Sequence, residues 1–245
     1  MIFKVIFEKY WKLLIAIILI IAVGYLLFWL RRYSAPQIFG EAVLKVKTDQ
    51  KVMALTFDDG PNPQSTEKIL ILLKKYQSKA TFFVVGNHAK KYPDLIRKIY
   101  NHGNEVGNHS WDHERLIYKN PALVRKEIDL TDELLRKLGY QGSIYFRAPY
   151  GHKLFVLPYI LMKTHRKHIL WTLELNDWDS PPPEKMLERF EREARPGAIV
   201  LLHDGYDGKY QSREATVKVV ELILKKYREK GYHFVTISEL LAYGG

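Results

Sequence analysis

The chain opens with one long apolar segment, residues 13–30, in which no side chain is charged. At about 1.5 Å per residue, a helix of this length reaches about 27 Å, close to the ~30 Å hydrocarbon thickness of a membrane. Tyr10, Trp11 and Trp29 lie near the two ends of the segment, where amphipathic rings favour the membrane interface. The pattern therefore predicts one N-terminal transmembrane helix.

A cleaved signal peptide is the competing interpretation of this segment. The apolar core of a signal is usually about 7–15 residues and ends at a small-residue cleavage site. Here the segment ends in FWLRR, which offers no such site. We therefore expect an uncleaved membrane anchor at residues 1–35, followed by a stalk at 36–50 and a folded domain at 51–245. The lysines before the segment slightly outnumber the arginines after it, which favours an extracellular domain.

After residue 50, short apolar runs typical of strands alternate with amphipathic stretches typical of helices. The strands are expected at 52–57, 80–85, 105–108, 143–146, 168–173, 198–202 and 233–236. The helices are expected at 66–76, 93–100, 121–138, 184–194 and 213–230. Repeated strand-then-helix units predict an α/β fold with a mainly parallel sheet, either closed as a barrel or open and doubly wound. In both folds, polar residues at the carboxyl ends of strands are the place to look for chemistry.

The composition narrows the class of protein. Of the 245 residues, 47% are hydrophobic and 27% are charged, as in ordinary globular proteins and unlike disordered chains. The chain contains no cysteine, which excludes disulfides, thiolate nucleophiles and cysteine-ligated zinc or iron–sulfur sites. The net charge is +11, of which the anchor region carries +4 (five lysines and arginines and one glutamate), so +7 remains for the rest. This remaining charge suits an anionic wall polymer or membrane surface, although a solvated, lysine-rich surface explains it equally well. No motif indicates a nucleic-acid partner or an obligate protein partner.

Two adjacent carboxylates, Asp58 and Asp59, follow the first predicted strand. Neighbouring side chains point in different directions, so one carboxylate could bind a cation while the other stays free as a base. An ordinary Asp-Gly-Pro turn is the alternative.

Two histidines follow the third predicted strand, in the sequence NHSWDH. A spacing of four residues would place His109 and His113 on one side of a helical turn, as in other metal sites. With nine histidines in the chain, such a pair also arises by chance. Together with Asp59, the pair would leave coordination positions open for water and substrate, as a catalytic metal requires.

Further polar residues end later strands, namely Arg147, Asp177 with Trp178, and His203. The arginine could orient a carboxylate through two hydrogen bonds. A surface arginine before a proline turn and a buried, hydrogen-bonded histidine are the alternatives. Each residue alone favours the ordinary structural explanation, whereas the whole set of polar strand ends favours an active site.

These segments, in this order, resemble the NodB-type polysaccharide deacetylases, carbohydrate esterase family 4. The resemblance covers about residues 50–240 and rests on five motifs: TFDDGP at 56–61, HSWDH at 109–113, RAPYG at 147–151, DW at 177–178 and LLH at 201–203. It implies a distorted (β/α) barrel, a divalent metal that is usually zinc, and hydrolysis of acetamido groups on N-acetylated sugars.

The resemblance also implies roles for individual residues. Asp58 would be the general base and His203 the general acid. Arg147 would hold Asp58, and Asp177 would support His203. Glu174 departs from the aspartate that family members often carry ahead of the Asp-Trp pair, which leaves the tuning of His203 open.

Metal and substrate ligands follow from the same resemblance. The implied metal ligands are Asp59, His109 and His113. The implied substrate-binding groups are the backbone N–H of Tyr150 for the oxyanion and the side chains of Trp178 and Leu201 for the acetyl group. Residues 152–166 match no subfamily pattern.

We therefore expect a membrane-anchored, metal-dependent carbohydrate N-deacetylase whose catalytic domain faces the outside of a bacterial cell. Peptidoglycan is the favoured polymer, because a single-pass tether keeps the enzyme beside it, and chitin-type oligosaccharides are the alternative. A non-catalytic, tethered sugar-binding domain would have lost the base or the acid, whereas Asp58 and His203 are both present. Non-haem iron oxygenases also use two histidines and one carboxylate, but their usual all-β scaffold disagrees with the strand–helix alternation.

Overall fold

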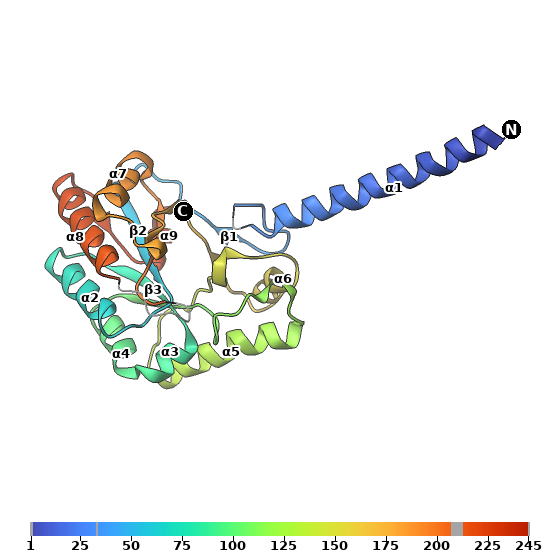
Figure 1. Ribbon diagram of the computed structural model, residues 1–245. Helices are drawn as coiled ribbons and strands as arrows, with labels where there is room; N and C mark the ends of the chain where they lie inside the picture. Colours follow the sequence, from blue (N-terminus) through green and yellow to red (C-terminus); the bar gives the residue numbers. More distant parts are fainter. Residues whose placement is uncertain (1, 33, 207–212, 245) are drawn as a thin grey trace.

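The computed structural model describes residues 2–32, 34–206 and 213–244. Helix α1 (Ile2–Leu30) projects away from the folded body of the protein (Figure 1). From Lys9 to Leu30 this helix is long and apolar enough to cross a membrane, and no part of that stretch is buried in the body. Length and composition satisfy a membrane span and a signal sequence alike, so the predicted anchor remains a prediction at this stage.

The centre of the body is a parallel sheet in the order β4-β3-β2-β7-β6, with β8 paired to the start of β2. The strands are β2 (Val52–Asp58), β3 (Ala80–Val84), β4 (Glu105–Asn108), β6 (Leu173–Glu174), β7 (Ile199–His203) and β8 (His233–Phe234). Strand β2 is buried along its whole length and pairs with β7 in a register that places Asp58 opposite His203.

Isolated β-bridges extend the sheet beyond β4, so that it curves back toward β7. Phe146 bridges both Asn108 at the end of β4 and His168 at the start of β5 (His168–Ile169). Strand β5 pairs with β1 (Ala42–Val43), and the bridge from Lys45 to Ala198 returns the path to the start of β7. The result is an irregular α/β barrel, which confirms the predicted fold class.

Two of the expected strands are wrong in extent. Only Phe146 of the expected strand at 143–146 forms a bridge, and the expected strand at 168–173 is divided between β5 and β6. The physical reason is the buried Arg147 side chain, whose guanidinium donates to the carbonyl oxygens of Ile169 and Leu170. These carbonyl groups accept from a side chain where a regular strand would offer them to its neighbour.

The segment at 36–50, which we expected to be a stalk, is partly folded into the body. It contributes β1, and the side chains of Val43 and Val46 are buried in the interior of the barrel. The backbone N–H of Val46 donates to the carbonyl oxygen of Gly197 at 2.9 Å. The mixed composition of this segment hid two apolar residues that pack inward.

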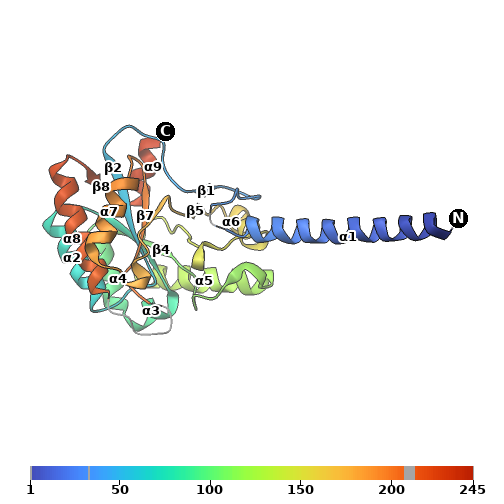
Figure 2. The same ribbon diagram turned by 45° about the horizontal axis from the view of Figure 1, so that its top comes forward.

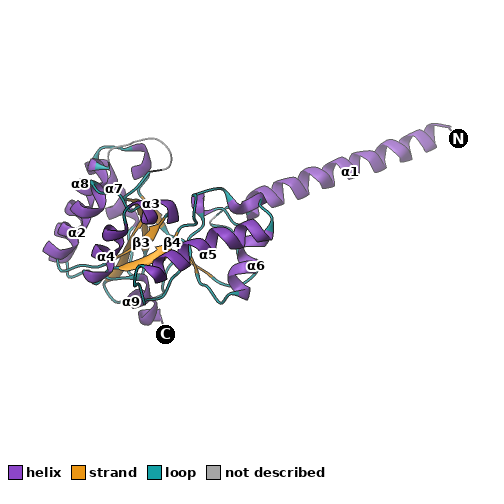
Figure 3. Ribbon diagram, turned by 90° about the horizontal axis from the view of Figure 1, so that it is seen from below, coloured by secondary structure: helices purple, strands orange, loops and turns teal. Residues whose placement is uncertain are grey.

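Helices surround the sheet, as the view from below shows (Figure 3). They are α2 (Ser65–Lys75), α3 (Gly86–Lys91), α4 (Pro93–Asn101), α5 (Pro121–Lys137), α6 (Val156–Lys163), α7 (Pro183–Glu193), α8 (Glu214–Glu229) and α9 (Ile237–Leu241). Short 3₁₀ turns lie at η1 (Leu116–Tyr118), η2 (Pro149–Gly151), η3 (Asp177–Asp179) and η4 (Ala242–Gly244). The short helices α3, α6 and α9 were not predicted, because they contain too few residues to show a helical repeat of apolar positions.

The alternation of side chains along β2 separates two cores. Met53, Leu55 and Phe57 pack outward against α2, α4, α7 and α8, whereas Val52 and Ala54 pack into the barrel interior. Because successive side chains alternate, Thr56 and Asp58 also face the interior. Helix α9 packs into the interior beside Val52 and Ala54, so the opposite end, at Asp58, is where polar groups gather.

One close approach inside the barrel generates a stability prediction. A Cβ atom on Gly107 would lie 2.5 Å from Cδ1 of Phe83, whose ring centroid lies 4.1 Å from the Arg147 guanidinium carbon. We expect Gly107→Ala to lower the free energy of unfolding by about 1–3 kcal/mol, because the ring has no room to retreat. Urea unfolding of the full chain in detergent micelles, followed by tryptophan fluorescence, would measure the change.

The matched test is the double variant Gly107→Ala, Phe83→Leu. Removing the ring makes room for the new methyl group, so the double variant should be more stable than the sum of the two single changes predicts. A wild-type unfolding midpoint for Gly107→Ala alone would contradict the tight contact.

Candidate active site

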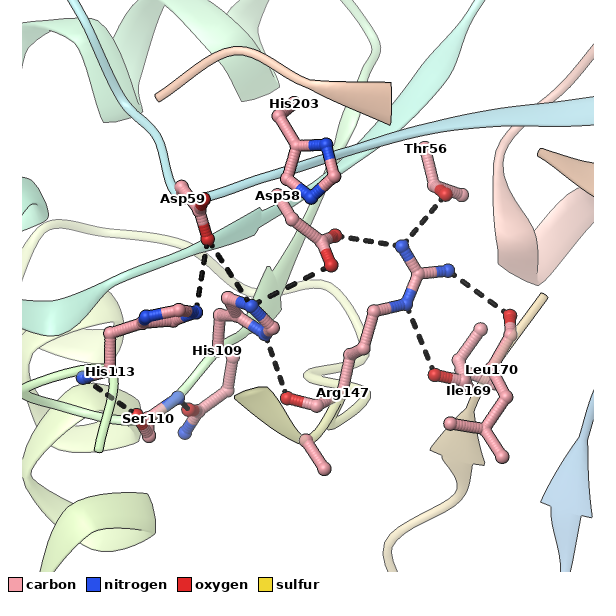
Figure 4. Close-up of polar contacts among 12 residues, drawn as sticks. Thr56, Asp58, Asp59, His109, Ser110, His113, Arg147, Ile169, Leu170 and His203 are labelled. Carbon is pink, nitrogen blue, oxygen red and sulfur yellow. Dashed lines mark hydrogen bonds and ion pairs between the residues drawn. The ribbon is translucent and has the colours of Figure 1, made fainter. Parts of the chain in front are cut away.

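The predicted site residues converge at the carboxyl ends of β2, β4 and β7 (Figure 4). Asp58 ends β2, His109 follows β4 directly, and His203 ends β7. Asp59 and His113 come from the loops that follow β2 and β4. Parallel strands end at one edge of a sheet, and for this reason residues up to 145 positions apart in the sequence meet here.

Asp59, His109 and His113 form a compact cluster of potential metal ligands. Oδ1 of Asp59 lies 3.1 Å from Nε2 of His113 and 3.5 Å from Nε2 of His109. All three residues are buried, and one ligand atom from each lies within 4.8 Å of the others. Two imidazoles and one carboxylate are a donor set that fits a divalent metal and leaves further coordination positions open.

The predicted helical turn between the two histidines is wrong, although the pairing is right. The segment after β4 is an irregular loop, in which Ser110 (φ 68°) and His113 (φ 58°) have left-handed backbone conformations. The backbone N–H of Ser110 donates to Oδ1 of Asn108, and the N–H of His113 donates to Oγ of Ser110. These local hydrogen bonds turn the loop so that both imidazoles face Asp59.

The orientation of the His109 imidazole is fixed by a hydrogen bond to the backbone of Arg147. Its Nδ1 lies 2.9 Å from the carbonyl oxygen of Arg147, an acceptor, so Nδ1 carries the proton in this contact. Nε2, the other ring nitrogen, faces Asp59 and is the one available to bind a metal. Burial raises the pKa of the Asp59 carboxyl, but the adjacent His109 and His113 outweigh it and hold the pKa well below its usual value. The carboxylate is therefore ionised as a metal ligand must be.

Asp58 is held separately by Arg147. Nη1 of Arg147 donates to Oδ1 of Asp58 at 2.7 Å and to Oγ1 of Thr56 at 2.8 Å (Figure 4). The other carboxylate oxygen of Asp58 lies 3.6 Å from Nε2 of His109. Burial lowers the pKa of Arg147 and the Asp58 charge opposes that effect. One oxygen of Asp58 is therefore held by the arginine, and the other faces the cluster of potential metal ligands.

His203 has its own carboxylate partner. Nδ1 of His203 lies 2.8 Å from Oδ1 of Asp177, and the backbone N–H of His203 donates to Oδ2 at 2.8 Å. Burial disfavours the charged imidazolium, but the charge and hydrogen bond of Asp177, helped by Asp59 and Asp58, outweigh it and raise the pKa of His203 to about 9. At neutral pH the imidazole therefore carries a proton.

The three residues expected at the substrate lie around this centre. Tyr150 has a left-handed backbone (φ 60°), and its ring centroid lies 4.9 Å from that of His113. Trp178 is exposed on η3, and its indole N–H donates to Oε1 of Glu174 at 3.2 Å. Leu201 is buried on the inner face of β7, two residues before His203. Their substrate contacts remain predictions.

Several residues that contact the candidate site residues could not be identified by sequence analysis. Thr56 shares the inward face of β2 with Asp58, so the period of two could have indicated it. Thr216 on α8 donates to Oδ2 of Asp177 at 2.8 Å, and Nδ1 of His88 on α3 lies 2.7 Å from the carbonyl oxygen of Asp59. These last two come from helices distant in sequence, and nothing in their local pattern marks them.

A cavity of about 240 Å³ opens beside the cluster of potential metal ligands. Asp59 and His113 form one wall, and the remaining lining residues are Val85, Asn87, His88, Asp112 and Tyr206. The cluster is therefore reachable from this side, as the open coordination positions of a catalytic metal require.

Known proteins are similar to this chain in sequence and in fold. The profile of the family described as polysaccharide deacetylase matches residues 45–161. Peptidoglycan-N-acetylmuramic acid deacetylase PdaC of Bacillus subtilis is 36% identical over 80% of this chain, which spans 40% of that longer protein. A peptidoglycan-N-acetylglucosamine deacetylase of Bacillus cereus is 33% identical, with 83% of this chain and 94% of the relative covered.

A crystal structure supplies the matching fold. A pseudoenzyme of carbohydrate esterase family 4 from Bacillus anthracis superposes with a TM-score of 0.76 at 27% identity, covering 85% of this chain and 73% of that one. The fold and the sequence together define a polysaccharide deacetylase domain. The chain belongs to the polysaccharide deacetylase family, carbohydrate esterase family 4, which confirms the resemblance seen in the five motifs.

The ligand cluster predicts how metal content responds to substitution. We expect His113→Ala to weaken divalent-metal binding by at least about tenfold. Loss of a residue that only hydrogen-bonds to a metal ligand already lowers metal affinity by about this factor. Elemental analysis of the purified full chain after dialysis against a metal buffer would measure it. His102→Ala is the control, since His102 is exposed at the end of α4. Full metal occupancy in the His109→Ala, His113→Ala double variant would overturn the cluster as a metal site.

Proposed function

We propose that this protein is a metal-dependent hydrolase that removes N-acetyl groups from an N-acetylated glycan, with peptidoglycan as its polymer and zinc as its metal. One observation carries the proposal: an arginine-held carboxylate, Asp58, and a protonated imidazole, His203, lie beside a cluster of two histidines and one carboxylate. The peptidoglycan deacetylases among the relatives support the choice of polymer.

Amide hydrolysis needs the groups that this site assembles, since an amide is a poor electrophile with a poor leaving group. A divalent metal held by Asp59, His109 and His113 would polarise the acetamide carbonyl and acidify water. In our proposal Asp58 takes up the water proton through Oδ2, the oxygen that does not accept a hydrogen bond from Arg147. His203 donates its Nε2 proton to the departing amine, and Asp177 stabilises the charged imidazolium beforehand.

The remaining site residues position the substrate in this proposal. The backbone N–H of Tyr150, presented by a left-handed turn at the carboxyl end of the barrel, binds the oxyanion. Trp178, exposed beside the site, and Leu201, beneath His203 on β7, form the apolar wall for the acetyl methyl group.

We also propose that α1 is a retained single-pass anchor and that the body lies outside the cell. The apolar span from Lys9 to Leu30 supports a membrane position, and a peptidoglycan substrate requires an external site. The proposed division is an anchor at 1–35, a connecting segment at 36–50 that packs partly on the body, and a catalytic domain at 51–245.

A non-catalytic sugar-binding protein is the competing function, and the pseudoenzyme with the same fold makes the comparison concrete. The fold alone does not decide between the two, because the reaction depends on the side chains at the strand ends. Here the candidate base, acid and metal ligands are all present and mutually oriented.

The roles of the adjacent aspartates can be separated by experiment. Asp58→Asn should keep the metal while acetate release falls by roughly 10²–10⁴, because the amide cannot accept the water proton. Asp59→Asn should instead lower metal content, since a neutral amide is a weaker cation ligand. The assay would compare acetate release from peptidoglycan and from chitooligosaccharides, with Asp179→Asn on the exposed side of η3 as the control. Near wild-type rates in Asp58→Asn would overturn the deacetylase assignment.

The His203–Asp177 pair predicts the alkaline side of the pH profile. A general acid must be protonated, so kcat/KM should fall as the pH rises through the pKa of His203. Asp177→Asn removes the charge that raises this pKa, so the alkaline limb should move to lower pH. Measuring kcat/KM from about pH 5 to about pH 11 would test the shift, because this range brackets both the ordinary histidine pKa of about 6.5 and the raised value of about 9. An unmoved alkaline limb in Asp177→Asn would show that His203 is not the acid.

A further inference from the structure

A second apolar surface lies where α1 joins the body. Outside α1, nine large hydrophobic side chains remain exposed among the described residues. Two of them, Tyr150 and Trp178, border the active site. Four belong to segments next to the end of α1, and these are Ile38, Phe155, Tyr159 and Met162. We call these four residues the α6 surface.

Three residues of the α6 surface share one side of a helix. Tyr159 and Met162 lie on α6, and Phe155 is the N-cap residue directly before it. Spacings of four and three positions place the three side chains along the same side of the helix. The opposite side is already buried, since Leu157, Pro158, Ile160 and Leu161 are in the interior. Helix α6 therefore has a second apolar side that the body covers only in part, with exposed fractions of 37–46%.

The end of α1 is fixed to the start of α6. The backbone N–H of Lys153 donates to the carbonyl oxygen of Arg31 at 3.0 Å, and Nζ of Lys153 donates to that of Arg32 at 3.0 Å. Lys153 is three residues before α6, a distance of about 10 Å at most. Figures 1 and 2 both show α6 beside the base of α1, so the α6 surface lies at the level where α1 leaves the body.

The chemistry around this surface is that of a membrane interface. Nζ of Lys163 lies 5.7 Å from the ring centroid of Tyr159, and Phe39 packs edge-on against the same ring at 5.7 Å. Arg32 is exposed at the end of α1. Aromatic rings with lysine and arginine at their edges favour the boundary between lipid headgroups and acyl chains.

We propose that the α6 surface rests in the interfacial layer of the same membrane that α1 crosses, as a second attachment of the body. This inference rests on the proposed retention of α1 as an anchor. The two attachments, joined through Lys153, would hold the body against the lipid surface in one orientation. Loop 149–153, which carries Tyr150 of the active site, would then be fixed relative to the membrane.

Fluorescence quenching in proteoliposomes tests the proposal on the full chain. Because the chain contains no cysteine, Met162→Cys provides a single position for an environment-sensitive fluorophore. Ile71→Cys is the matched control, an exposed apolar residue on α2, which lies across the body from α1 (Figure 1). Ile20→Cys reports on α1 itself. The vesicles contain phosphatidylcholine and phosphatidylglycerol with nitroxide-labelled lipids, quenching either at the headgroup or deep in the acyl chains.

We expect a blue-shifted emission and quenching by headgroup nitroxides at Met162→Cys, no quenching at Ile71→Cys, and quenching by deep nitroxides at Ile20→Cys. Quenching at Ile20→Cys with Met162→Cys as unquenched as Ile71→Cys would overturn the α6 attachment and leave the anchor standing. An unquenched Ile20→Cys would overturn the anchor and this inference with it. Phe155→Cys provides a second label position if the Met162→Cys chain fails to fold.

Discussion

The guanidinium of Arg147 is the contact on which the barrel and its site both depend. It is fully buried, and its donors reach Asp58 and Thr56 on β2 as well as the carbonyl oxygens of Ile169 and Leu170. One charged group therefore joins the central strand to the irregular side of the ring, where regular strand pairing is lost. A buried charge of this kind is stable only while its partners are present, and removing one partner typically costs about 3–5 kcal/mol. The fold and the candidate base consequently depend on the same ion pair.

The two candidate proton-transfer groups each have a buried partner of opposite charge. The guanidinium of Arg147 pairs with Asp58, and the carboxylate of Asp177 pairs with His203. Burial disfavours the charged imidazole of His203, but Asp177 outweighs this effect and raises the pKa of His203 to about 9. Because each side chain interacts with its own counter-charge, the two groups can lie side by side in one buried site.

The strand and helix order and the main site residues could be predicted from the sequence, because a parallel α/β fold collects polar strand ends at one edge. Five short motifs were enough to place Asp58, Asp59, His109, His113, Arg147, Asp177 and His203 together. The irregular side of the barrel could not be predicted. The apolar residues there predict a regular strand, but the carbonyl oxygens of Ile169 and Leu170 accept hydrogen bonds from the Arg147 side chain. The loop at His109–His113 could not be predicted either, since its shape depends on hydrogen bonds from Ser110 and Asn108, nor could the contacts that Thr216 makes from a distant helix.

The register between β2 and β7 has a consequence for how this domain can diversify. Asp58 and His203 are direct partners in the parallel ladder, and both side chains face the barrel interior. Adjacent strands lie about 4.8 Å apart, so the separation of the two backbones is set by main-chain hydrogen bonds. Insertions and deletions in the surrounding loops can reshape the glycan-binding surface without altering that separation. Loop length can therefore change the glycan-binding surface while the backbone ladder keeps the candidate base and the candidate acid at one separation.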